Sequence, residues 1–279
     1  MNYIHGLALA LIVAVLPSLA GSAPPFQSVR FLTADADTDV DLTAKILVDG
    51  SDVSNGQYVL SQNADSRIAI EVSAEAGGQY YKRTLTIFLE GISKSTKPVF
   101  KIYLAKRGSG SIYTRGSVKA ASEYINGESV DRAVALLVRM NEESSPEQKA
   151  AQFGVYLYYS LARAYLLNCT QRFVDQCALA KELFDKLSNQ YDDQKRFFSA
   201  ESISKTSLQN ADIAIHGHRI VYLRARWDLS SGRLEDALRG FEELITAVQS
   251  DPSLLKPLNL TLEGLRSDTA LVKTKLTPK

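Results

Sequence analysis

Three sets of residues in this chain have types and spacing that could do chemistry. Four aspartates alternate along Asp35–Asp41, as in some calcium loops, but Val40 and Ile46 stand where the EF-hand loop requires Gly and Glu. His216 and His218 could serve a metal or a nucleophilic catalyst, yet no cysteine or acid lies nearby at ligand spacing. We interpret these segments as a solvated loop and a polar helix start, and a non-EF-hand calcium site at the edge of the sandwich is the alternative for the aspartates. We therefore expect no metal, no cofactor and no enzyme activity.

The third set is the pair Cys169 and Cys177, the two cysteines of the chain. In an exported protein, a pair of cysteines forms a disulfide more often than a metal site or a catalytic thiol. Both cysteines fall in a stretch that is longer than the equivalent stretch of a neighbouring helix pair. We expect a disulfide that closes this short loop, with two free buried thiols as the alternative.

The N-terminus carries an export pattern. The first 20 residues contain no charged side chain, Gly6–Leu16 is an apolar run, and Pro17 and Ser18-Leu19-Ala20 follow. Small residues at this place fit a signal-peptidase site after Ala20. The run is too short for the roughly 20 residues that span a bilayer. We expect a periplasmic or secreted protein with a cleaved signal peptide and no stable membrane span.

Length and charge limit the function classes. A chain of 279 residues has room for two domains. Its net charge of +1 and the lack of a run of Lys and Arg argue against nucleic acid as a ligand. The partner that we expect is therefore another protein or peptide of the cell envelope.

Residues up to about Arg107 read as short strands. Apolar and polar residues alternate in several segments, and Gly, Asn, Asp and Ser clusters separate them. This pattern predicts an antiparallel sandwich. The expected strands are Gln27–Thr33, Asp41–Val48, Gln57–Leu60, Arg67–Ala74, Tyr80–Glu90 and Val99–Lys106.

One segment of this region resembles a known family. Ser51–Leu60 contains an acidic turn that ends in Gly56 and is followed by Tyr58 and Leu60. It is similar to the turn and strand of carboxypeptidase regulatory-like (transthyretin-like) domains, although one extra residue separates Asp52 from Gly56. Because those domains are accessory modules, the resemblance implies a transthyretin-like or immunoglobulin-like sandwich and no catalysis.

Beyond Gly108-Ser109-Gly110-Ser111 the periodicity changes from two to about 3.6 residues, which indicates helices. A pattern of a small residue and an aromatic, then Ala and a large apolar residue four positions later, recurs along this part. Small residues let two helices approach closely, so the pattern predicts stacked helix hairpins. Its copies are Ala121, Tyr124, Ala133 and Leu137; Ala162, Tyr165, Ala180 and Phe184; Ala225, Gly232, Ala237 and Phe241.

The third copy resembles the tetratricopeptide repeat. Leu229–Ala237, followed by Phe241 and Leu244, is very like the turn and second helix of that repeat. Asp228 replaces the expected aromatic residue, and the copies are irregularly spaced, so the resemblance implies divergent repeats with lengthened helices.

In that family the first helix of each pair lines a concave surface that binds ligands. The resemblance therefore implies a partner-binding groove, in which Tyr and Arg suit peptide backbones and carboxylates. Packing of the tyrosines on neighbouring helices is the alternative. The implied groove positions are Arg115, Val118 and Ser122; Tyr156, Tyr159 and Arg163; Arg219, Tyr222 and Arg226.

Together these patterns predict an α+β chain of two separate domains, a small antiparallel β-sandwich followed by an α-helical superhelix. We assign residues 1–20 to the signal peptide, 21–107 to the sandwich, 108–117 to a linker and 118–279 to the helical domain. The expected function is non-catalytic partner binding in the cell envelope, with Arg163 and Arg226 pairing the acids of the partner. The alternative is a structural subunit that pairs through an edge strand of its sandwich.

Overall fold

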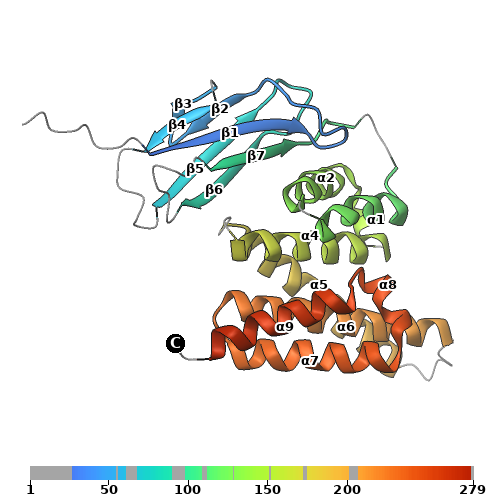
Figure 1. The fold of residues 1–279 in the computed structure, drawn as a ribbon. Helices are drawn as coiled ribbons and strands as arrows, with labels where there is room; N and C mark the ends of the chain where they lie inside the picture. The colour runs from blue at the N-terminus through green and yellow to red at the C-terminus, as the bar shows by residue number, and fades with distance from the viewer. Residues whose placement is uncertain are drawn as a thin grey trace, which may run out of the picture.

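The computed structural model describes residues 27–54, 56–60, 68–89, 98–108, 112–127, 129–150, 152–171, 175–200 and 207–277. The expected signal segment, residues 1–20, lies outside these described residues. Strands occupy the N-terminal part and helices the C-terminal part, so the chain is α+β, as predicted (Figure 1).

The strands form where apolar and polar residues alternate. In β6, Leu85, Ile87 and Leu89 are buried and the residues between them are not. The described strands build two sheets, ordered β4-β1-β7 and β3-β2-β5-β6, whose buried residues share one core. The bounds are β1 (Gln27–Asp35), β2 (Lys45–Val48), β3 (Ser51–Asp52), β4 (Gln57–Leu60), β5 (Ile68–Glu75), β6 (Arg83–Leu89) and β7 (Val99–Leu104).

The expectation of purely antiparallel strands is wrong for one pair. β1 and β7 run parallel, with Arg30 opposite Val99 and Asp35 opposite Leu104. These two strands are the first and last described strands, and no hairpin turn joins them, so no local turn dictates their relative direction. By contrast, a local turn joins the antiparallel strands β2 and β3. Its residues Asp49 and Gly50 have positive φ angles of 48° and 79°, which are typical of a two-residue hairpin turn.

The helices occupy the segments that carry the recurring pattern, and most residues of that pattern are buried. Figure 1 shows the helices stacked below the β region, with α1 and α2 nearest to it and α7 and α9 farthest away. The bounds are α1 (Arg115–Glu123), η1 (Tyr124–Asn126), α2 (Val130–Glu143), α3 (Pro146–Ala150), α4 (Gln152–Gln171), α5 (Asp175–Ala200), α6 (Ser207–Ser230), α7 (Leu234–Ser250), η2 (Pro252–Leu254), α8 (Leu255–Leu258) and α9 (Leu262–Leu276).

Small residues bring the third helix pair close together. Ala225 of α6 and Ala237 of α7 are buried, and a Cβ atom added at Gly240 would lie 2.8 Å from the Cβ of Ala225. The turn before α7 uses Gly232 at a φ of 77°, a conformation that glycine adopts without a steric penalty. The pattern of the sequence therefore corresponds to a real close approach of two helices.

The cysteine pair connects two of these helices. Cys169 lies near the end of α4 and Cys177 near the start of α5, with their Cα atoms 5.2 Å apart. This separation lies within the usual range for a disulfide. The two cysteines therefore lie at the distance that the expected disulfide requires.

Helix α2 connects the β region to the helices. Arg83 of β6 donates two hydrogen bonds of 2.8 Å to the carboxylate of Asp131 on α2, and the side chains of the pair are only 9% and 12% exposed. Asp131 also accepts the backbone N–H of Tyr103. Breaking a buried pair of this kind leaves an uncompensated charge, which is strongly destabilising. The β region and the helices are therefore held in one arrangement.

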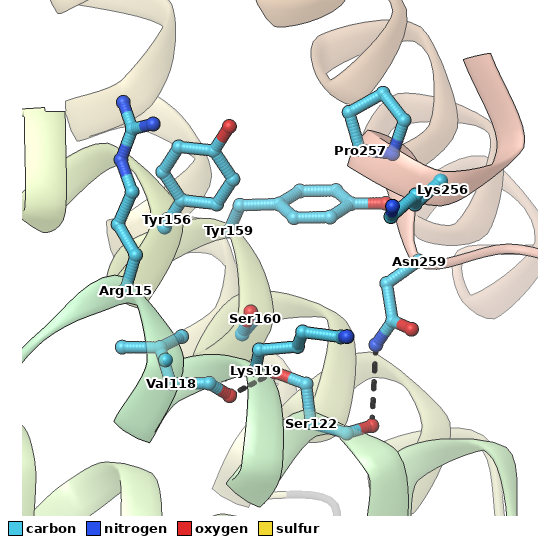
Figure 2. A pocket seen from close by; sticks show the side chains of 11 residues that line it. Arg115, Val118, Lys119, Ser122, Tyr156, Tyr159, Ser160, Lys256, Pro257 and Asn259 are labelled. Carbon is cyan, nitrogen blue, oxygen red and sulfur yellow. Dashed lines mark hydrogen bonds between the residues drawn. The ribbon is translucent and has the colours of Figure 1, made fainter. Parts of the chain in front are cut away.

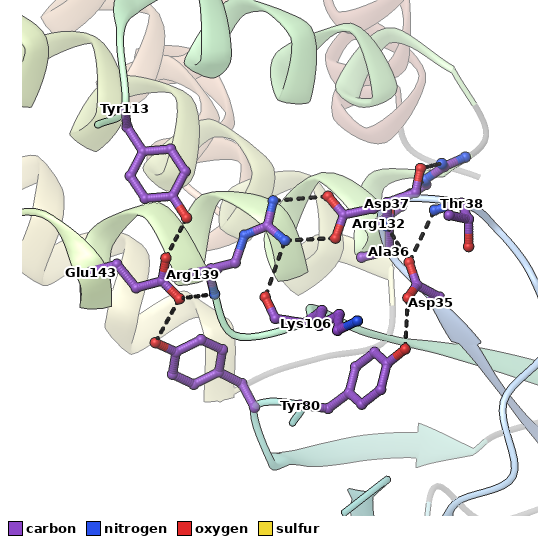
Figure 3. Close-up of polar contacts among 12 residues, drawn as sticks. Asp35, Ala36, Asp37, Thr38, Tyr80, Lys106, Tyr113, Arg132, Arg139 and Glu143 are labelled. Carbon is purple, nitrogen blue, oxygen red and sulfur yellow. Dashed lines mark hydrogen bonds and ion pairs between the residues drawn. The ribbon is translucent and has the colours of Figure 1, made fainter. Parts of the chain in front are cut away.

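The aspartate row of the sequence belongs to the same junction (Figure 3). Arg139 of α2 holds the carboxylate of Asp37 at 2.6 and 2.9 Å, and Arg132 donates to the carbonyl oxygens of Ala36 and Asp37. Lys101 donates to Asp39 at 2.8 Å. The loop is thus a docking element and not merely a solvated loop. The calcium alternative receives no support, because protein cations already pair with Asp37 and Asp39.

Glu143, at the end of α2, completes the junction. Its carboxylate accepts hydrogen bonds from Tyr81, from Tyr113 and from the backbone N–H of Gly108 (Figure 3). Burial raises the pKa of Glu143, but these hydrogen bonds outweigh burial and hold the pKa below its ordinary value. The start of the segment expected to be a linker is thereby tied to α2.

Candidate binding site

The site begins with the N-terminal cap of α1. The Thr114 side chain accepts a hydrogen bond from the N–H of Ser117, and the Ser117 hydroxyl accepts one from the N–H of Thr114. This reciprocal cap fixes the start of α1 at Arg115. Residues three and four apart share a helix face, so the cap places Arg115, Val118, Lys119 and Ser122 on one side of α1.

The expected groove is not open along its whole length. Tyr159, Tyr222, Arg163, Arg219 and Arg226 are between 1% and 5% exposed. They are five of the six residues that the repeat resemblance assigned to the second and third parts of the binding face; the sixth, Tyr156, is half-buried. The packing alternative describes them better than an open surface does.

The C-terminal segment of the chain itself contacts these residues. Arg219 donates to the carbonyl oxygen of Pro257 at 3.0 Å, and the Tyr159 hydroxyl donates to that of Leu258 at 2.7 Å. Arg226 forms a 2.6 Å ion pair with Asp268 of α9. The predicted role of Arg226, pairing with an acid of a partner, is thus taken by an acid of this chain.

Arg163 is also engaged within the chain. It donates to the side-chain oxygen of Asn126 at 2.6 Å and lies 5.7 Å from the ring centroid of Tyr222. Leu258 is fully buried and Leu260 is 8% exposed, so apolar burial holds the C-terminal segment against the helices. The sequence pattern did not predict this return of the C-terminal segment across the helical face.

A pocket of about 360 Å³ remains open between α1, α4 and α8 (Figure 2). Of the predicted groove positions, Arg115, Val118, Ser122, Tyr156 and Tyr159 line it, whereas Arg163, Arg219, Tyr222 and Arg226 do not. The described lining residues are Arg115, Gly116, Val118, Lys119, Ser122, Tyr156, Tyr159, Ser160, Lys256, Pro257 and Asn259.

An aromatic ring surrounded by arginines forms one wall of this pocket. The guanidinium carbons of Arg115 and Arg219 lie 4.5 and 4.2 Å from the ring centroid of Tyr156. Arg219 also lies 5.5 Å from the ring centroid of Tyr159, and Tyr159 meets Tyr222 edge to face. Such cation–π contacts fix the positions of both the rings and the guanidinium groups. The wall is therefore rigid and positively charged.

The opposite wall is fixed by Asn259. This residue has a φ of 52° at the end of α8, and its amide donates to the backbone oxygen of Ser122 at 3.2 Å (Figure 2). Its side-chain oxygen accepts a hydrogen bond from Asn126. Asparagine tolerates this left-handed conformation better than most residues. The C-terminal wall of the pocket is thus attached directly to α1.

The sequence missed several lining residues. Lys119 and Ser160 lie one helical turn beyond Arg115 and Tyr156, so their helix positions could have identified them. Lys256, Pro257 and Asn259 carried no such signal, because they enter the site from a distant part of the chain. Their contribution depends on the return of the C-terminal segment.

The histidines lie elsewhere. His216 is 2% exposed in the interior of α6, where it meets the ring of Tyr191, so the expectation of a polar helix start is wrong at this residue. Burial, with a smaller effect of Arg219, lowers the pKa of His216 to about 4. Within the described part of the chain, no group of three or more His, Cys, Asp or Glu side chains is placed to hold a metal ion.

Among the described helices, none combines the length and the apolar character needed to cross a membrane. Searches of protein families, curated proteins and solved structures find nothing that matches this chain.

Proposed function

We propose that this protein is a non-catalytic interaction module that holds a segment of a partner protein in the pocket between α1, α4 and α8. The observation that carries the proposal is the pocket itself, about 360 Å³ in volume and lined by two tyrosines, a proline and three cations. Tyrosine and arginine are typical anchors of protein interfaces. The volume lies within the range of small ligand sites, so one anchor residue of the partner fits it.

The arrangement of the chain supports a scaffold role. In this proposal the helices are divergent tetratricopeptide-like pairs, and the two sheets form a sandwich that α2 holds rigidly against them. The cysteine pair at disulfide distance is compatible with the periplasm or with secretion. The partner is then another protein of the cell envelope or the extracellular space.

Photo-cross-linking tests this proposal. Gly116 and Pro257 line the pocket and are not among its cations, and each is replaced by p-benzoylphenylalanine in the full chain and irradiated in the cells that produce it. Arg266 and Lys275 of α9, exposed and outside the pocket, serve as matched positions. We expect the same partner adduct from both pocket positions and none from α9. Equal adducts from all four positions, or none from the pocket, would contradict the proposal.

A second candidate function rests on β4. This strand is at the end of its sheet, and Val59 on it is 46% exposed. Exposed edge strands can pair with a strand of another protein, as a structural subunit would do. If this edge carries the function, Val59→Lys abolishes partner capture while cross-linking from the pocket gives no adduct.

A further inference from the structure

The cations around the pocket have no acids to balance them. Arg115 and Lys119 come from one face of α1, and Lys256 comes from α8 on the opposite side. All three are exposed, and no acid is found among the described residues that line the pocket. No ion pair joins these three cations to an acid elsewhere in the described ranges. They are therefore free to meet an anion from outside.

The buried side of the same face carries further positive charge. Arg163 and Arg219 are 5% and 3% exposed, and neither forms an ion pair with an acid in the part of the chain that the structure describes. The Nε atoms of both have no hydrogen-bond partner there. Of the three buried arginines on this face, Arg226 forms an ion pair with Asp268, whose charge also acts on Arg163, whereas Arg219 has no ion pair among the described residues. Buried cations without counter-charges are unfavourable, so a nearby anion is favoured.

The remaining walls are apolar. Val118 is 1% exposed, and the rings of Tyr156 and Pro257 flank the cavity (Figure 2). A ligand that satisfies the whole pocket therefore combines a negative charge with an apolar part. In a protein segment this combination is a carboxylate beside an apolar side chain.

Resting on the proposed function, we propose that the pocket recognises a carboxylate of the partner segment, with Lys119 and Lys256 beside the carboxylate and an adjacent apolar side chain against Val118, Tyr156 and Pro257. Guanidinium and ammonium groups form charge-assisted hydrogen bonds with carboxylates, about twice as strong as neutral ones. The carboxylate belongs either to the C-terminus of the partner or to an Asp or Glu within it.

Titration followed by NMR tests the ligand chemistry. The full chain is titrated with N-acetyl-leucine and with N-acetyl-leucinamide, which differ only in the carboxylate. We expect shifts at Lys119 and Lys256 and an affinity for the acid roughly tenfold higher than for the amide. A third probe, N-acetyl-glutamate with its α-carboxyl group blocked, distinguishes an internal acid from a C-terminus. Equal affinities for leucine acid and amide, or no shift at these lysines, would overturn the inference.

Charge variants supply the matched control. Lys119→Glu with Lys256→Glu reverses two exposed pocket cations, and Arg266→Glu with Lys275→Glu makes the same change in net charge on α9. We expect the pocket pair to lose the preference for the acid and the α9 pair to keep it. If both pairs lose it equally, long-range charge and not the pocket explains the preference, and the inference is wrong.

The two proposals can fail separately. If the pocket cross-links to a partner but the acid and the amide bind equally, the proposed partner site stands and the carboxylate inference fails. If the acid binds selectively but no partner is cross-linked, the carboxylate preference stands and the proposed partner site fails.

Discussion

At the scale of single residues, arginine has two roles on the helical face. Arg163, Arg219 and Arg226 are buried and hold the chain's own segments, whereas Arg115 is exposed at the rim of the pocket. Residue type alone does not separate these roles, because both kinds of arginine stack on tyrosine rings. What separates them is the C-terminal segment, which covers the first kind and leaves the second open.

The Arg226–Asp268 pair leads to a stability prediction. Asp268→Asn leaves Arg226 buried without a counter-charge, and we expect a loss of about 2–3 kcal/mol in the free energy of unfolding, measured by urea denaturation. Replacing both residues by Leu and Met should cost less than this single change. Glu263→Gln, at an exposed position of the same helix, is the control, and an equal loss from it would refute the argument.

His216 predicts a pH dependence. Because its pKa is lowered to about 4 in the folded chain, the unfolded chain takes up a proton near the ordinary value of 6.5 while the folded chain does not. Stability is therefore full above pH 6.5 and declines as the pH falls towards 4, by up to about 3 kcal/mol. Denaturation curves at several pH values should show a smaller decline in His216→Phe. His218→Phe should keep the decline of the original chain, and a shared slope in all three proteins would exclude His216 as its source.

At the scale of elements, helix α2 determines how the two regions meet. One of its sides carries Asp131, Arg132, Arg139 and Glu143, which bind Arg83, the aspartate loop and the start of the connecting segment. The helix periodicity of α2 was predictable from its buried apolar residues. The hydrogen-bond partners of its charged side were not predictable, because they lie between 28 and 102 positions away in the sequence, a separation that no local pattern encodes.

Glu143 tests this junction. Glu143→Gln keeps the shape of the side chain but replaces one acceptor oxygen by an NH2 group. This group donates, as do the Tyr81 and Tyr113 hydroxyls and the Gly108 N–H that surround it. We expect a loss of about 1–2 kcal/mol in the free energy of unfolding, measured by urea denaturation. Since the folded pKa of Glu143 is lowered, its contribution is present above its ordinary pKa and disappears as the pH falls through the folded value.

The difference between Glu143→Gln and the original chain should therefore vanish in acid. Glu142→Gln, at the exposed neighbouring position, is expected to behave like the original chain at every pH. A loss of the same size from Glu142→Gln would show that the charge of α2, and not the contacts of Glu143, sets stability.

At the scale of the whole molecule, the sequence predicted the division into a β region and a helical region and most of the helix positions. Periodicity and small-residue spacing carry this information locally, as Ala133, Ala180 and Ala237 show by being fully buried. The parallel pairing of β1 with β7 and the covering of Arg226 by α9 were missed. Both are contacts between distant segments, whose partners no nearby residue specifies.

The pocket shows the same limit. Its α1 and α4 walls follow from helix periodicity, whereas the wall made by Lys256, Pro257 and Asn259 exists only because the chain returns to α1. The return of the C-terminal segment therefore both engages Arg219 and Arg226 and forms one wall of the open pocket. In the proposed function, the partner segment binds beside the C-terminal segment of the chain, near Lys119 and Lys256.

The most direct test of this account places a cross-linker at position 116, which lines the pocket, and identifies the partner residue that becomes attached to it by mass spectrometry of the digested adduct. The account predicts an attachment point next to an Asp, a Glu or the C-terminus of the partner, with an apolar residue beside it. Attachment within a partner segment that has no carboxylate nearby would contradict it.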